Sequence, residues 1–230
     1  MAPLPDASAP TEAAPAKAAQ KVSPQRRKRV LDAAEELFSQ RGFYGVTVRQ
    51  VAEMAKVDVA LPNYYFGSKR GLFDAVFHRR AEVLNRARGD GIDAVVVTAG
   101  TARPKVEAIL DAFIAPVREA QASSDPGWRN YCRLVAQVNS SAEFAEMMST
   151  HFDDLIEKLL RALRLALPQA KDTELYWAYH LLTGALTLTM ANTGRIDRLS
   201  HGKVHSENAR DAYSHLVTFF ARGFTEIAND

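Results

Sequence analysis

The feature that most constrains this chain is a helical repeat of apolar residues through its second half. From residue 104 onward, apolar side chains recur at steps of three or four, which places them on one face of an α-helix. The three stripes are Phe144, Met148, Phe152, Leu155, Leu159 and Leu163; Leu175, Ala178, Leu182, Leu186 and Thr189; and Tyr213, Leu216, Phe220, Phe224 and Ile227. Breaks that contain Pro or Gly separate the stripes, and no strand-like alternation competes. The pattern predicts an all-α helical bundle.

The composition excludes several other classes of protein. The 230 residues are 47% hydrophobic and 24% charged, which is typical of a globular chain with a real core. The single cysteine, Cys132, excludes an intramolecular disulfide and a Cys–Cys metal site, so we expect a reducing, cytoplasmic location. We expect neither a membrane span nor a signal peptide, because no long apolar run occurs and the first 20 residues have no compact apolar segment.

The charge and composition of the chain differ between its two ends. Residues 1–22 contain few aromatic or branched apolar side chains, so we expect a disordered tail. Order is expected from Ser23 and Pro24, a helix-capping residue followed by a residue suited to the first helical turn. Residues 1–90 carry 15 Lys and Arg against 10 Asp and Glu, a net charge of +5, whereas the remainder carries 14 against 17, a net of −3. The N-terminal part is therefore the better candidate for a polyanion partner.

Between residues 26 and 84 the pattern predicts four helices in quick succession. Thr47 and Gln50 have the spacing of a capping box at the start of a short helix. A tight turn follows, Asp58 is a candidate cap for a third short helix at about residues 59–65, and Ser68 caps a longer fourth helix. Two short helices joined by a tight turn constitute a helix-turn-helix, whose second helix fits the major groove of DNA.

The predicted recognition helix offers side chains suited to DNA. We expect Val59, Leu61, Asn63 and Tyr64 to be exposed on it. Apolar side chains can contact thymine methyl groups, an amide can bond a base edge, and a phenol can reach a base or a phosphate. The run of basic residues at 26–29 is either near DNA or simply a solvated helix face.

The same region resembles a known family. The segments VLDAA at 30–34, LF at 37–38, RGF at 41–43, TVRQVA at 47–52 and NYYFGSK at 63–69, followed by LF at 72–73, resemble the DNA-binding domain of TetR-family transcriptional repressors. The resemblance implies a homodimer in which an N-terminal helix-turn-helix domain binds an operator. A C-terminal helical domain then binds a small-molecule effector and dimerises. We place these domains at residues 23–88 and 89–230, with the conformation of residues 89–104 left open.

The resemblance also implies roles for individual residues. Thr47, Arg49, Tyr64 and Lys69 correspond to phosphate or groove-edge contacts, and the base-facing positions correspond to Val59, Ala60, Leu61 and Asn63. Two residues depart from the family pattern. Lys56 stands where the family has Gly in the turn, so the turn must form without the residue that best tolerates a positive φ. Pro62 falls within the recognition helix, where it can cost one backbone hydrogen bond.

The C-terminal half resembles a fatty-acid-responsive subgroup of the family over residues 128–133, 152–166 and 174–180, with Gly184. This implies an apolar or acyl-like effector. The candidate ligand-binding residues are Phe113, Trp128, Tyr131, Trp177 and His180, although each also fits an ordinary core position. One recognition helix reads few base pairs, so we expect a homodimer on a palindromic operator, joined through residues 175–190 and 213–227.

Two alternatives to a ligand-controlled regulator stay open at this point. One is a helical-bundle enzyme, and the other is a DNA-binding protein without an effector. The sequence has no Glu-x-x-His pair, no His-Glu-x-x-His, no phosphate-binding P-loop and no Gly-x-Ser-x-Gly. We therefore predict no catalytic residue, no metal site and no cofactor. Metal analysis with a turnover screen separates the first alternative, and ligand-dependent release of DNA separates the second.

Overall fold

The computed structural model describes residues 23–227, and over this range it is helical without strands, which confirms the predicted all-α fold. The predicted disordered tail, residues 1–22, lies outside the described residues. The helices are α2 (Pro24–Arg41), α3 (Val48–Ala55), α4 (Leu61–Phe66), α5 (Lys69–Ala99), α6 (Val106–Ala122), α7 (Pro126–Asn139), the 3-10 helix η1 (Ala142–Phe144), α8 (Ala145–Ala166), α9 (Asp172–Ala191), α10 (Arg195–Leu199) and α11 (Ala209–Glu226).

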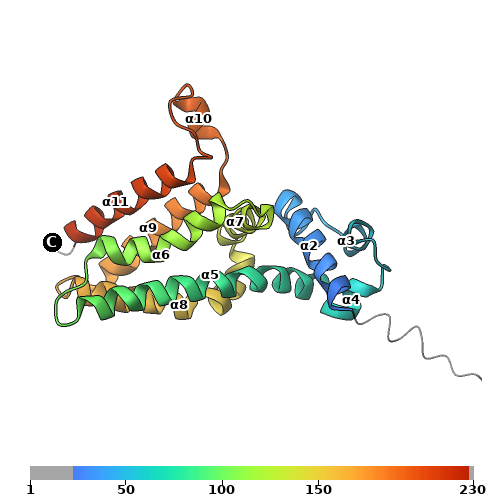
Figure 1. Ribbon diagram of the computed structural model, residues 1–230, viewed down its shortest axis with the longest axis horizontal. Coiled ribbons are helices and arrows are strands. Elements are labelled where there is room, and N and C mark those ends of the chain that lie inside the picture. Colours follow the sequence, from blue (N-terminus) through green and yellow to red (C-terminus); the bar gives the residue numbers. More distant parts are fainter. Residues whose placement is uncertain (1–22, 228–230) are drawn as a thin grey trace, which may run out of the picture.

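Helix α5 connects the two ends of the molecule. Figure 1 shows α2, α3 and α4 gathered at one end of α5, and α6, α8, α9 and α11 forming the body at the other end. Helix α7 lies between the two groups and packs against both α2 and α9. The short α10 projects away from the body (Figure 1). Within residues 23–227, no helix combines the length and the apolar composition that a membrane span requires.

The stretch whose conformation the sequence left open is helical. Helix α5 continues through Gly89 and Gly91 to Ala99 and ends at Gly100, which has a φ of 57°. At Gly91 a Cβ atom would lie 3.4 Å from the backbone and side chain of Ala112, so the glycine lets α5 and α6 approach closely. The expected boundary at residue 88 therefore coincides with no break in secondary structure.

One continuous apolar core runs through both groups of helices. Within it, Phe73 of α5 contacts aromatic rings from two other elements, with ring-centroid distances of 5.0 Å to Phe38 of α2 and 5.3 Å to Phe144 of η1. The predicted stripes supply the core of the body, where Leu159, Leu182 and Tyr213 are fully buried. Because aromatic packing is short-ranged and close-packed interiors transmit displacement, the two ends of the molecule are mechanically joined.

Candidate nucleic-acid interface and effector cavity

The helix-turn-helix begins with the predicted capping box. The Thr47 Oγ1 accepts a hydrogen bond from the Gln50 backbone N at 3.2 Å, and the Gln50 Oε1 accepts one from the Thr47 backbone N at 2.8 Å. These bonds satisfy backbone donors that have no partner within the helix. Val51 and Ala52 are fully buried on the inner face of α3, which leaves Arg49 on its exposed face.

The turn after α3 adopts the backbone that the family pattern requires, although it lacks glycine. Lys56 has φ 53° and ψ 52°, a left-handed conformation that is unfavourable for a residue with a Cβ. Asp58 Oδ1 then accepts a hydrogen bond from the Ala60 backbone N at 2.8 Å. Helix α4 begins at Leu61, two residues later than predicted, because this Asx-type turn occupies residues 58–60.

The later start of α4 changes two of the sequence predictions. Leu61 is only 3% exposed and packs inward, so its predicted base-facing role is wrong. Pro62 occupies the first turn of α4, where a backbone N–H has no helical partner, so it breaks no hydrogen bond of the helix. Val59 and Ala60 are exposed but precede the helix in the turn.

The outer surface of α4 presents polar side chains to solvent. Asn63 is exposed, and Tyr64 is 59% exposed. Tyr65, on the inner side, accepts a hydrogen bond from the Ser23 backbone N at 3.1 Å and donates one to the Ser23 carbonyl at 3.2 Å. These bonds attach α4 to the start of α2, so Asn63 and Tyr64 stand on a helix whose position is fixed.

The two basic residues among the predicted phosphate contacts, Arg49 and Lys69, have partners within the chain. The Arg49 Nε lies 2.9 Å from Glu53 Oε1 in an exposed ion pair. The Lys69 Nζ lies 4.4 Å from the centroid of the Phe43 ring, at the N-terminus of α5. Ser68 caps that N-terminus by accepting a hydrogen bond from the Gly71 backbone N at 3.0 Å. Exposed pairs of this kind are weak, so they leave both cations free to exchange partners.

A small cavity of about 60 Å³ lies inside the C-terminal body, between α5, α6, α7, α8 and α9. Phe113 and Tyr131 line it, as two of the five predicted ligand-binding residues. The Tyr131 hydroxyl is buried and has no hydrogen-bond partner within residues 23–227. Burial raises the pKa of Tyr131, so the hydroxyl stays a neutral donor at neutral pH. The Cys132 thiol lines the same cavity, and burial raises its pKa to about 12.

The most unusual group in the cavity wall is the buried guanidinium of Arg88, from α5. Its Nε donates a hydrogen bond of 2.7 Å to the Phe113 carbonyl, and its Cζ lies 3.6 Å from the centroid of the Phe113 ring. No carboxylate of residues 23–227 forms an ion pair with it. Burial lowers the pKa of Arg88 to about 10, so the group is still a cation at neutral pH. The sequence did not single out this residue.

The other three predicted ligand-binding residues lie elsewhere. Trp128 sits beneath Arg80, whose Cζ is 4.6 Å from the indole ring, at the junction of α2, α5 and α7. His180 lines an open groove between α7 and α9. Trp177 is 64% exposed on the outer face of α9. These three residues do not line the cavity. The sequence prediction was wrong for them because helical periodicity alone does not distinguish an inner face from an outer one.

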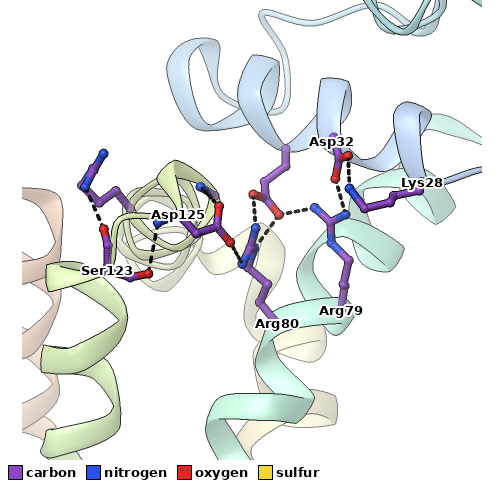
Figure 2. A network of polar contacts seen from close by, with 9 residues as sticks. Lys28, Asp32, Arg79, Arg80, Ser123 and Asp125 are labelled. Atoms are coloured by element: carbon purple, nitrogen blue, oxygen red, sulfur yellow. Dashed lines mark hydrogen bonds and ion pairs between the residues drawn. The ribbon is translucent and has the colours of Figure 1, made fainter. Parts of the chain in front are cut away.

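A group of charged residues joins the DNA-binding end to the body, and we call Asp32, Glu35, Arg79, Arg80 and Asp125 the junction network. Figure 2 shows Arg79 and Arg80 of α5 reaching toward α2, with Asp125 beyond Arg80. Glu35, only 2% exposed, accepts hydrogen bonds from Arg80 Nε at 2.8 Å and Nη2 at 3.0 Å, and another from Arg79 Nη2.

The outer members of the junction network pair with the same two arginines. Asp32 Oδ1 lies 2.7 Å from Arg79 Nη1, and Asp125 Oδ2 lies 3.1 Å from Arg80 Nη1. Burial lowers the pKa of Arg80, but the hydrogen bond and charge of Glu35 outweigh it and the pKa is raised. Gly127 completes the fit, because a Cβ there would lie 1.8 Å from Arg80 Nη2. Nothing in the sequence pattern predicts this network.

Two models of one regulator family match most of the described chain. The model described as bacterial regulatory proteins, tetR family, matches residues 30–76, and a model described as a tetracyclin repressor-like C-terminal domain matches residues 111–223. Among curated proteins, the HTH-type transcriptional regulator BetI of Brucella canis is 34% identical over 100 residues, which are 44% of this chain and 48% of the relative. BetI of Rhizobium meliloti is 35% identical over 89 residues, 39% of this chain and 42% of the relative. The matched part of the chain thus spans about half the length of the curated relatives.

Known crystal structures share the fold at low sequence identity. A transcription regulator assigned to the tetR family from Shewanella has a TM-score of 0.59 at 15% identity, covering 86% of this chain and 97% of the other. A regulator from Saccharomonospora viridis, crystallised with choline, has a TM-score of 0.54 at 15% identity, covering 86% and 96%. The two family models together extend over the helix-turn-helix and most of the body. The chain belongs to the TetR family of transcriptional regulators.

Proposed function

We propose that this protein is a transcriptional regulator that binds a DNA operator through α4 and its flanks and is released by a small-molecule effector bound in the C-terminal body. The observation that carries the proposal is the exposed pair Asn63 and Tyr64 on a short helix that follows a capped helix and a left-handed turn. The match of residues 30–76 to the family model supports the same interpretation. An operator on chromosomal DNA places this activity in the cytoplasm.

In this proposal, base reading and phosphate binding fall on different residues. Asn63 reads a base edge through its amide, while Val59 and Ala60 offer apolar contacts from the turn. Thr47, Arg49, Tyr64 and Lys69 position the protein on the phosphate backbone. The Arg49–Glu53 ion pair opens when DNA binds, which costs little because exposed pairs contribute about 0–1 kcal/mol.

The experiment that tests this division compares two variants on a bound duplex and on its single-base variants. Lys69→Ala should weaken binding to all duplexes alike and reduce the dependence of affinity on salt concentration. Asn63→Ala should weaken the preferred duplex by about 1–3 kcal/mol and relax the preference at the base pair that the amide contacts. A uniform loss of affinity from Asn63→Ala would contradict base reading.

We further propose that the protein is a homodimer. The outer faces of α9 and α11 carry an exposed apolar stripe, Trp177, Leu181, Leu188 and Phe219, which we call the outer stripe. Gly184 of α9 and Gly223 of α11 have open space where a Cβ would be, so a second helix can approach closely. Exposed large apolar side chains at helical spacing on an outer helix face are typical of an interface. Two copies joined here would present two α4 helices to a palindromic operator.

The path from effector to DNA follows α5. This helix carries Arg88 in the cavity wall, carries Arg79 and Arg80 in the junction network, and begins beside α4. Helix α2 packs against both α5 and α7. An effector that shifts α5 relative to α7 therefore changes the position of α2 and the spacing of the two recognition helices in the dimer. The effector needs only to bind the DNA-incompetent arrangement more tightly, and the ratio of affinities sets the size of the release.

The regulator from Saccharomonospora viridis, which was crystallised with choline, supports a small organic molecule as the general kind of effector. For this chain, an effector is tested by titrating candidate small molecules into a preformed complex with DNA. Release of DNA by at least one compound that binds the body supports the proposal. Unchanged DNA binding at saturating occupancy of the cavity would favour the alternative of a DNA-binding protein without effector control.

A further inference from the structure

The cavity in the C-terminal body contains a positive charge that no carboxylate of residues 23–227 neutralises. The Arg88 guanidinium is buried, and its hydrogen bond within residues 23–227 goes from Nε to the Phe113 carbonyl. Its other neighbours in the wall are the phenol rings of Tyr131 and Tyr179 and the Cys132 thiol, all neutral at physiological pH. A buried cation without a counter-charge is unfavourable, and such groups are normally paired.

A second, independent group in the same wall lacks a partner. The Tyr131 hydroxyl is buried and makes no hydrogen bond to residues 23–227, although a buried hydroxyl is usually satisfied. Arg88 comes from α5 and Tyr131 from α7, so two helices contribute donors to the wall of one cavity. A guanidinium and a phenol together match the two oxygen atoms of a carboxylate, which accepts hydrogen bonds and supplies the missing charge.

We propose that the effector is an organic acid whose carboxylate binds Arg88 and Tyr131. The inference rests on the proposed function and narrows it, because it names the chemical class of the effector and the residues that recognise its charged group. It also excludes a cationic effector, since a quaternary ammonium ion in this cavity would lie against the buried guanidinium.

The rest of the cavity wall limits the size and polarity of the bound acid beyond its carboxylate. Most of the remaining wall is apolar, with side chains such as Val117, Met148 and Phe152. It also contains three polar side chains, Asn139, Thr183 and Thr187, of which Asn139 donates a hydrogen bond to Thr187. The part of the acid beyond the carboxylate is therefore mainly apolar. The volume of about 60 Å³ holds a carboxylate and a few carbon atoms at most. A longer tail has to displace Met148 and Phe152 of α8, which are only partly buried, and methionine adapts readily to new neighbours. Binding of such an acid would therefore move α8 against α5.

The test is isothermal titration calorimetry of the full chain with straight-chain carboxylates from butyrate to octanoate. The matched comparisons are the primary alcohols and the alkyltrimethylammonium ions of the same chain lengths. Acids should bind at least about 10-fold more tightly than alcohols of equal length, because the carboxylate forms charge-assisted bonds, and the ammonium series should not bind. Equal affinity for acids and alcohols, or binding of the ammonium series, would overturn the proposal.

Three variants identify the residues involved. Tyr131→Phe removes a hydroxyl that has no hydrogen-bond partner among the described residues, so it should fold normally and weaken binding of acids about 10-fold without affecting alcohols. Arg88→Met should remove the preference for acids, and Arg88→Lys should restore part of it. If Arg88→Met does not fold, Tyr131→Phe decides alone, and acid binding that is unchanged in Tyr131→Phe contradicts the assignment.

DNA binding, measured by fluorescence anisotropy on a labelled duplex, separates this inference from the proposed function. Acids that bind through Arg88 and also release DNA support both. Acids that bind through Arg88 but leave DNA bound support the carboxylate site and contradict regulation through it. Release of DNA by a compound without a carboxylate, with no acid binding, supports the regulator and overturns the carboxylate site.

Discussion

Replacing Glu35 with Gln removes the one buried carboxylate of the junction network while keeping the size and shape of the side chain. In the native chain Glu35 accepts three hydrogen bonds from Arg79 and Arg80. The amide of Gln keeps one acceptor oxygen, and in either orientation its NH₂ group points donors at an N–H group of Arg80. Breaking a buried ion pair from one side costs about 3–5 kcal/mol, because the partner charge stays buried and unpaired.

The expected loss lies toward the lower end of that range. Arg79 and Arg80 are partly exposed and keep a second carboxylate each, Asp32 and Asp125. We therefore expect Glu35→Gln to lower the free energy of unfolding by about 3 kcal/mol, measured by urea denaturation followed by circular dichroism. Glu36→Gln is the matched control, because Glu36 is the exposed neighbour on the same helix, and it should change stability by less than about 0.5 kcal/mol. A loss below about 1 kcal/mol for Glu35→Gln would refute the role given to the network.

Three further predictions concern the turn, the junction and the outer stripe. Lys56→Gly should raise the free energy of unfolding by about 0.5–1 kcal/mol in urea denaturation, because Gly adopts the left-handed backbone at lower cost; a loss of stability would contradict this. The Gly127 backbone N–H, and then Arg80, lower the pKa of Asp125, so its contribution to stability is present above the usual pKa of 3.8 and is lost as pH falls through the lowered pKa. Asp125→Asn should abolish that loss in acid unfolding curves, and identical curves for the two proteins would count against it. Trp177→Glu should convert the dimer into a monomer in analytical ultracentrifugation, whereas a dimer that persists at micromolar concentration would place the interface elsewhere.

The sequence predicts the local features of the fold well because their signals are local. The capping box at Thr47 and Gln50 and the apolar stripes of α8, α9 and α11 depend on neighbours within a few positions, and the structure has them as expected. The start of α4 was placed two residues early because Asp58 can cap a helix or hold a turn, and the tertiary fold decides between them. For the same reason Leu61, which was expected to be exposed on the recognition helix, is buried.

Features that depend on distant contacts were not predictable in this way. Gly89 and Gly91 left the conformation of residues 89–104 open, whereas in the structure α5 continues through both glycines and Gly91 packs closely against Ala112 of α6. In the sequence, Arg88 resembles any other basic residue of the N-terminal part, and only the fold places it in the wall of a cavity. Trp177 was predicted to bind the ligand but is exposed on the outer face of α9. The sequence does not separate the two positions, because an outer apolar stripe and an inner one have the same period.

The most direct test of the central claim is a selection of duplexes from a random pool by the purified protein at low ionic strength, followed by sequencing. The account predicts enrichment of an inverted repeat whose half-sites are about one helical turn of DNA apart or a multiple of that distance. It also predicts that Asn63→Ala selects a different or weaker consensus at one position of each half-site. No enrichment, or a pool that wild-type protein and Asn63→Ala enrich identically, would contradict it.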